Sequence, residues 1–83
     1  QPHIPSAGSC FKNPKDDYAG RLIEAVGLKG YKIGNMSFSQ EHANFLVNLG
    51  GGTYEEAVEI INLAKSRIKN QFNIDIEEEV IIY

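Results

Sequence analysis

The longest run of helical periodicity in the chain begins at Thr53. Glu56 follows three residues later, and this pair forms a capping box in which each side chain can bind the other residue's backbone amide. Apolar residues then recur at helical spacing on one face, which is more typical of a helix packed on a core than of a partner-binding surface. They are Ala57, Ile61, Ala64, Ile68 and Phe72. The pattern predicts a long amphipathic helix.

A shorter helix is expected after Pro14. Asp16 or Asp17 can cap its start, and Gly27 is suited to end it just after Val26. Its apolar positions are spaced by four residues, at Tyr18, Leu22 and Val26.

Apolar and alternating segments predict four strands. These are residues 8 to 12, Tyr31 to Phe38, Asn44 to Asn48, and Ile74 to Tyr83. A helical turn capped by Ser39 separates the second from the third, and the glycines at 50 to 52 form a loop. In the last strand, Glu79 lies on the side opposite the apolar Val80 and Ile82. The predicted order is β-α-β-β-α-β, an α+β fold in which helices pack on a small sheet, with residues 1 to 83 as a single domain.

Length, charge and cysteine content limit the classes of function that this chain can have. With 83 residues, a single domain has little room to enclose a large cofactor. The formal charge of -3 and the absence of a Lys/Arg run argue against nucleic acid or an anionic membrane as the main partner. No signal peptide or membrane span is evident. A single cysteine, Cys10, cannot build a disulfide within the chain or a multi-cysteine metal site, so we expect a reducing, cytoplasmic setting and no metal.

The segment SAGSCFKNP, residues 6 to 14, is the first candidate for chemistry. Alternation in an extended chain places Ser9, Phe11 and Asn13 on one side and Cys10 on the other. From the residues alone, Ser9 and Asn13 are better read as satisfying turn amides than as reactive groups. A thiol nucleophile formed by Cys10 and His42 is an alternative, although a buried free thiol is the favoured reading.

Several motifs together resemble one known family. GSCFKNP, AGRLIEAVGLKGYKIGN, the Ser-x-x-His-Ala-Asn-Phe-x-Val-Asn pattern of residues 39 to 48, and IEEEVIIY are similar to the C-terminal domain of UDP-N-acetylenolpyruvoylglucosamine reductase, the MurB family of peptidoglycan synthesis. The resemblance covers residues 6 to 82. It implies a cytoplasmic oxidoreductase that uses FAD and NADPH to convert UDP-N-acetylglucosamine enolpyruvate to UDP-N-acetylmuramate, and so serves cell wall biogenesis, cell shape and cell division.

The resemblance also assigns roles to domains and residues. FAD is held by two N-terminal domains that this chain lacks, so the chain alone is expected to bind no cofactor and to be inactive. By the family motif, Ser9 protonates the enolate intermediate, and Glu79 helps to stabilise it. Asn13 and His42 are expected to contact the UDP-sugar.

Some positions depart from the family pattern. Glu78 stands where proline is usual and Ile81 where arginine is usual, while Asn35 replaces a common glycine and Gly51 a frequent asparagine. The loss of the arginine and the short chain leave a second hypothesis open, a free-standing binding module without catalysis. A parent reading frame that extends about two hundred residues upstream would exclude this module.

Overall fold

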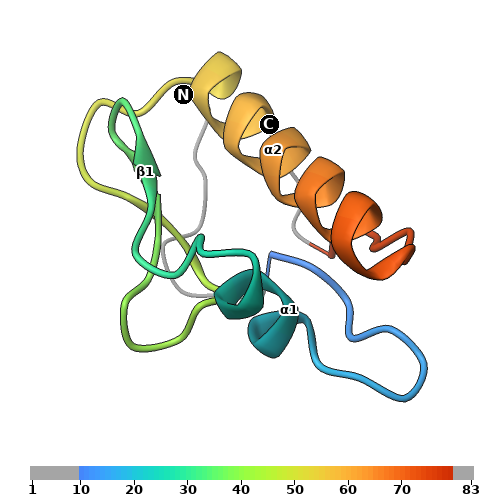
Figure 1. Cartoon of the computed structure of the whole chain (residues 1–83). Helices are drawn as coiled ribbons and strands as arrows, with labels where there is room; N and C mark the ends of the chain where they lie inside the picture. Colours follow the sequence, from blue (N-terminus) through green and yellow to red (C-terminus); the bar gives the residue numbers. More distant parts are fainter. Residues whose placement is uncertain (1–9, 80–83) are drawn as a thin grey trace.

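A computed structural model describes residues 10 to 79 of the chain. Its longest element is α2, Tyr54–Phe72, which lies along one side of a small β-sheet (Figure 1). The short helix α1 lies near the C-terminal end of α2, where Arg21 contacts the ring of Phe72. The capping box is present, because Thr53 Oγ1 accepts from the amide of Glu56 at 3.1 Å and Glu56 Oε1 accepts from the amide of Thr53 at 3.1 Å. The predicted long helix is therefore confirmed.

The carboxylate of Glu56 has a second partner. Its Oε1 also accepts from the amide of Asn35, at 3.2 Å, in the turn that joins the first two strands. Gly34 precedes Asn35 with a φ of 58°, and a β-carbon there would collide with the carboxylate of Glu56. The turn thus favours glycine for its backbone conformation, and a larger residue would also displace the Glu56 carboxylate from its bond to Asn35.

Helix α1 spans Ala19–Ala25, within the predicted range. Its N-cap residue is Tyr18, so the prediction of Asp16 or Asp17 at this position is wrong. Asp17 still accepts from the amide of Tyr18, at 2.7 Å. Tyr18 is 69% exposed and lies outside the buried face to which its spacing had assigned it. Gly27 ends the helix as predicted, with a φ of 80°.

The sheet has three antiparallel strands in the order β1-β2-β3. They are β1, Lys32–Ile33, β2, Met36–Phe38, and β3, Leu46–Asn48. In the register, Ile33 pairs with Met36 and Ser37 pairs with Val47. The single strand predicted from Tyr31 to Phe38 is therefore wrong, because the Gly34-Asn35 turn folds it into a hairpin.

The strands predicted at residues 8 to 12 and Ile74 to Tyr83 form no regular strand within the described residues, and they meet at a single β-bridge. Phe11 and Glu78 form an isolated antiparallel bridge, and the rest of residues 74 to 79 is irregular. Helix α2 ends at Phe72, and its C-cap residue Asn73 takes a left-handed conformation. The following segment runs back along the helix, where Asp75 pairs with Lys69 and Glu78 with Lys65. The α+β class is confirmed, although the observed regular elements follow the order α-β-β-β-α.

The core lies between the sheet and the two helices. Its largest fully buried side chains come from both helices, from β2 and β3, and from the connecting segments: Phe11, Leu22, Ile23, Leu28, Met36, Phe38, Leu46, Ile60 and Ile68. Between residues 10 and 79, no helix is both long and apolar enough to cross a membrane, and no group of three or more His, Cys, Asp or Glu side chains could hold a metal ion.

Candidate functional site

The segment that follows Ser9 lies beside the segment that contains Glu79. The amide of Glu79 donates to the carbonyl oxygen of Cys10 at 2.8 Å, and the amide of Lys12 donates to the carbonyl oxygen of Glu77 at 2.9 Å. Ser9 itself lies outside the described residues. The hydrogen bonds nevertheless join Glu79 to Cys10, the residue that follows Ser9 in the chain, although the two segments are far apart in sequence.

The departure at Glu78 is compatible with this arrangement. Both hydrogen bonds of the bridge are made by Glu77 and Glu79, so the amide of residue 78 is not used in it. A proline, which lacks this amide, would therefore cost the bridge no hydrogen bond. The side chain of Glu78 forms an exposed ion pair with Lys65 at 2.7 Å, which lowers the pKa of the carboxyl group. Ile81, the other departure in this segment, lies outside the described residues.

Glu79 is exposed at the end of the described chain. Its side chain is the third of three successive glutamates, of which Glu78 is balanced by Lys65. The backbone bond to Cys10 fixes the path of the chain at Glu79, while the residue remains exposed.

Asn44 was not assigned a role from the sequence, yet it binds the same segment. Its side-chain oxygen accepts from the amide of Phe11 at 3.0 Å, and its side-chain nitrogen donates to the carbonyl oxygen of Phe11 at 2.9 Å. Its own carbonyl oxygen accepts from the amide of Cys10 at 2.6 Å. The only sequence signal for this contact is the His-Ala-Asn-Phe motif itself, because the partners are 33 residues apart.

Cys10 is fully buried, and Phe11 is buried at 1% exposure. The segment is covered on both sides, because Cys10 and Phe11 both belong to the core. Burial, with a smaller contribution from the charge of Glu78, raises the pKa of the Cys10 thiol to about 12. The buried free thiol is confirmed, and a thiolate nucleophile at neutral pH is disfavoured.

This burial predicts how the thiol responds to reagents and to pH. Cys10 in the folded chain is expected to react with iodoacetamide far more slowly than in the chain unfolded by urea, as mass spectrometry of timed samples would measure. The free energy of unfolding should also fall as the pH rises from about 9 towards 12, because the unfolded chain loses the thiol proton near pH 9 while the folded chain retains it. Equal alkylation rates in the two states would contradict the buried position.

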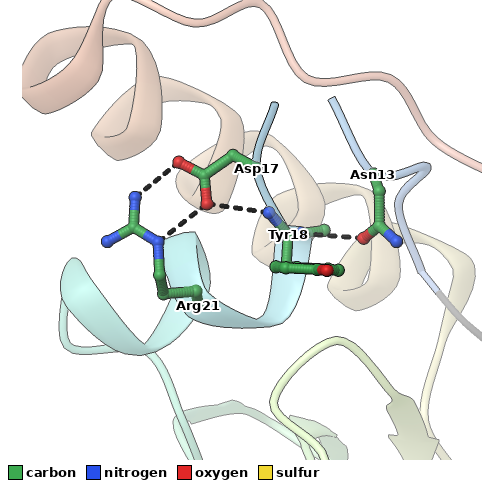
Figure 2. Close-up of polar contacts among 5 residues, drawn as sticks. Asn13, Asp17, Tyr18 and Arg21 are labelled. Atoms are coloured by element: carbon green, nitrogen blue, oxygen red, sulfur yellow. Dashed lines mark hydrogen bonds and ion pairs between the residues drawn. The ribbon is translucent and has the colours of Figure 1, made fainter. Parts of the chain in front are cut away.

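Asn13 contacts the first turn of α1. Its side-chain oxygen accepts from the amide of Ala19 at 2.9 Å, on the side of the amide group that faces the helix (Figure 2). Beside it, Asp17 accepts from Arg21 Nε at 2.7 Å, and this pairing, with the bond from Tyr18, lowers the pKa of Asp17 to about 2. Asn13 therefore satisfies a backbone amide, as the residues alone suggested, and its NH₂ group takes no part in this bond.

A cleft of about 320 Å³ opens beside Asn13. It is lined by Lys12, Asn13, Pro14, Lys15, Asp75, Ile76 and Glu77. Two cationic and two anionic side chains therefore face it, together with the amide group of Asn13.

His42 lies apart from this cleft. It is exposed, its ring lies 5.1 Å from that of Phe45, and its amide donates to Ser39 Oγ at 3.2 Å. Ser39 Oγ also accepts from the amide of Glu41, so the predicted capping by Ser39 is confirmed, although residues 39 to 42 form a turn without regular helix. Among the predicted site residues in the described part of the chain, Asn13 lines the cleft, whereas Glu79 and His42 do not.

The α+β core and the pairing of residues 10 to 12 with residues 77 to 79 describe a small α+β domain, and its sequence matches a known family. The family model for the C-terminal domain of UDP-N-acetylenolpyruvoylglucosamine reductase matches residues 1–83. The chain belongs to this family, which confirms the resemblance seen in its motifs.

Proteins named UDP-N-acetylenolpyruvoylglucosamine reductase are among its relatives. The protein of Helicobacter pylori strain J99 is 58% identical over 81 residues, which cover 98% of this chain and 31% of the relative. That of Aquifex aeolicus is 54% identical over 78 residues, covering 94% and 26%. The crystal structure of the Thermus caldophilus reductase, MurB, aligns with a TM-score of 0.71 at 40% identity over 95% of this chain and 28% of that one. The chain thus spans about a third or less of the length of these relatives.

Proposed function

We propose that this chain is the substrate-side domain of a longer, FAD-dependent and NADPH-using oxidoreductase that converts UDP-N-acetylglucosamine enolpyruvate to UDP-N-acetylmuramate. The observation that carries the proposal is the pairing of Cys10 with Glu79, which joins the segment of the proposed proton donor to that of the proposed enolate-stabilising carboxyl group. The names of the relatives supply the reaction, and their greater length supports further domains.

The flavin is assigned to those further domains. The cleft beside Asn13, at about 320 Å³, is near the small end of the range for ligand pockets, and its mixed charges suit part of a substrate better than a dinucleotide. When bound, the reduced flavin would supply the hydride that adds to the terminal CH₂ carbon of the enolpyruvyl group. The residues of this chain would then act on the enolate that remains.

Ser9 is proposed to give that enolate its proton. Transfer of the hydroxyl proton to the carbon beside the carboxylate completes the lactyl ether and leaves a serine alkoxide, which regains a proton from solvent. A serine hydroxyl is a very weak acid, but an enolate carbon is basic enough to take its proton when the two are held in contact. A neighbouring histidine is not required, which agrees with the position of His42 beside Phe45.

Glu79 is proposed to stabilise the same enolate. A bare carboxylate would repel the developing negative charge, so the side chain would act as a neutral carboxyl group or together with an arginine from another domain. Its exposure agrees with a site that is completed by contact with the rest of the protein.

Asn13 and His42 are proposed to contact the UDP-sugar. Asn13 would donate from its NH₂ group, since its oxygen already binds the amide of Ala19. His42 would contribute from the exposed turn after Ser39. A cytoplasmic location is part of the proposal, because a free cysteine is typical of a reducing compartment.

The division of labour between domains is tested with residues 1–83 alone. The purified chain should be colourless, should not bind added FAD in ultrafiltration, and should not oxidise NADPH in the presence of the UDP-sugar. The measurement is the absorbance of the flavin retained with the protein, with the full-length protein as the positive control. Recovery of FAD in equimolar amount with the short chain would overturn the assignment of the flavin to other domains.

A further inference from the structure

One edge of the backbone that follows Ser9 is bound by a side chain that is distant in sequence. Asn44 binds both the amide and the carbonyl oxygen of Phe11, through its own amide group, at 3.0 and 2.9 Å. This double exchange has the form of a hydrogen-bonded residue pair in an antiparallel sheet, although a side chain takes the place of one strand. The carbonyl oxygen of Asn44 adds a third bond, to the amide of Cys10 at 2.6 Å.

The opposite edge of the same segment is bound by backbone alone. Glu79 donates to Cys10, and Lys12 donates to Glu77. Residues 10 to 12 therefore run between the 77–79 segment on one edge and Asn44 on the other. If Asn44 were shortened, the amide and carbonyl oxygen of Phe11 would lose their protein partner while the Glu79 edge kept its bonds.

Asn44 is itself fixed by the turn that precedes β3. The amide of Phe45 donates to the carbonyl oxygen of His42 at 2.8 Å, and the amide of Ser39 donates to the carbonyl oxygen of Phe45 at 2.9 Å. Ser39 Oγ also accepts from the amides of Glu41 and His42 within the turn. The side chain of Asn44 is thus presented to Phe11 by a turn that is built independently of residues 10 to 12.

We propose that Asn44 is a positioning residue for Ser9. This inference rests on the proposed role of Ser9 as the proton donor. Ser9 is joined to Cys10 by a peptide bond, so a change in the path of Cys10 and Phe11, which Asn44 binds, would be passed on to it. Proton transfer to carbon requires the hydroxyl within contact distance, and a displacement of about 1 Å can cost on the order of a hundredfold in rate.

The test uses the full-length reductase and follows its two half-reactions separately in a stopped-flow spectrometer. Asn44→Ala should leave the reduction of the flavin by NADPH unchanged and should slow the reoxidation of the flavin by the UDP-sugar about 10- to 100-fold. Asn44→Asp keeps the size and the acceptor for the Phe11 amide but turns an oxygen towards the Phe11 carbonyl, so it should slow the same step. It serves as the informative variant if Asn44→Ala does not fold.

Asn48→Ala is the matched control. The side chain of Asn48 also binds backbone, accepting from the amides of Gly50 and Gly52 at 2.9 and 3.0 Å, but it does so in the glycine loop away from residues 10 to 12. It should lower the melting temperature without changing either half-reaction. If Asn48→Ala slows substrate reduction as much as Asn44→Ala, the effect of Asn44 is general destabilisation and the positioning role is wrong.

A double mutant separates this inference from the proposed function. In a Ser9→Ala background, Asn44→Ala should add little further loss to substrate reduction, because the group that it positions is gone. Multiplicative losses would overturn the positioning role and leave Ser9 as the donor. A Ser9→Ala variant that reduces substrate at the normal rate would instead overturn the proposed function, whatever Asn44 does.

Discussion

Replacement of Ser9 by alanine in the full-length reductase is expected to slow substrate reduction by about 10²- to 10⁴-fold, the range for loss of a positioned general acid. The alanine variant offers no proton to the enolate, so the intermediate must wait for a proton from solvent. Reduction of the flavin by NADPH should remain near the normal rate, because Ser9 takes no part in it. Single-turnover absorbance at the flavin wavelength measures both steps.

Two further variants sharpen this prediction. Ser9→Cys keeps a proton donor, of lower pKa, at the same place and should retain more activity than Ser9→Ala. Cys10→Ala is the neighbouring control, since its thiol is buried and faces the core. It should cost stability without a selective effect on substrate reduction. A Ser9→Ala variant that loses both half-reactions equally would contradict the acid role and indicate damage to the structure.

The second large effect is expected at Glu79. Glu79→Ala should slow substrate reduction by about 10²- to 10³-fold, comparable to the loss of one donor that stabilises developing negative charge. Glu79→Gln should be milder if the carboxyl group acts in its neutral form, because the amide keeps a hydrogen-bond donor. The same stopped-flow measurement distinguishes the two variants.

Glu78→Gln is the control from the same segment. It loses only the exposed ion pair with Lys65, worth about 0 to 1 kcal/mol, and should keep both half-reactions. A Glu79→Ala variant that behaves like Glu78→Gln would show that Glu79 is not involved in the chemistry.

Local rules predicted the parts of the fold that depend on neighbours in sequence. The capping box at Thr53 and Glu56 and the buried face of α2 are set within a few residues, so pattern alone was sufficient. The hairpin in residues 32 to 38 was missed although the Gly34-Asn35 pair is a turn signal, because its strands are too short to show alternation.

The candidate site was less accessible to sequence reasoning because its contacts are distant. Asn44 meets Phe11 across 33 residues, and Cys10 meets Glu79 across almost the whole chain. The burial of both Cys10 and Phe11 could not be derived from alternation for a related reason, since elements from elsewhere in the chain cover both sides of the segment. The chemistry assigned to Ser9 and Glu79 came from the family motif, and it stays a prediction until the variants are measured.

The Glu56 carboxylate couples local unfolding at the start of α2 to local unfolding of the hairpin turn. One oxygen binds the amide of Thr53 at the start of α2 and the amide of Asn35 in the hairpin turn. Fraying of the first helical turn would therefore release the hairpin turn at the same time, and loosening of the hairpin would uncap the helix. The two elements share one opening event, so hydrogen exchange at both amides should follow a common rate.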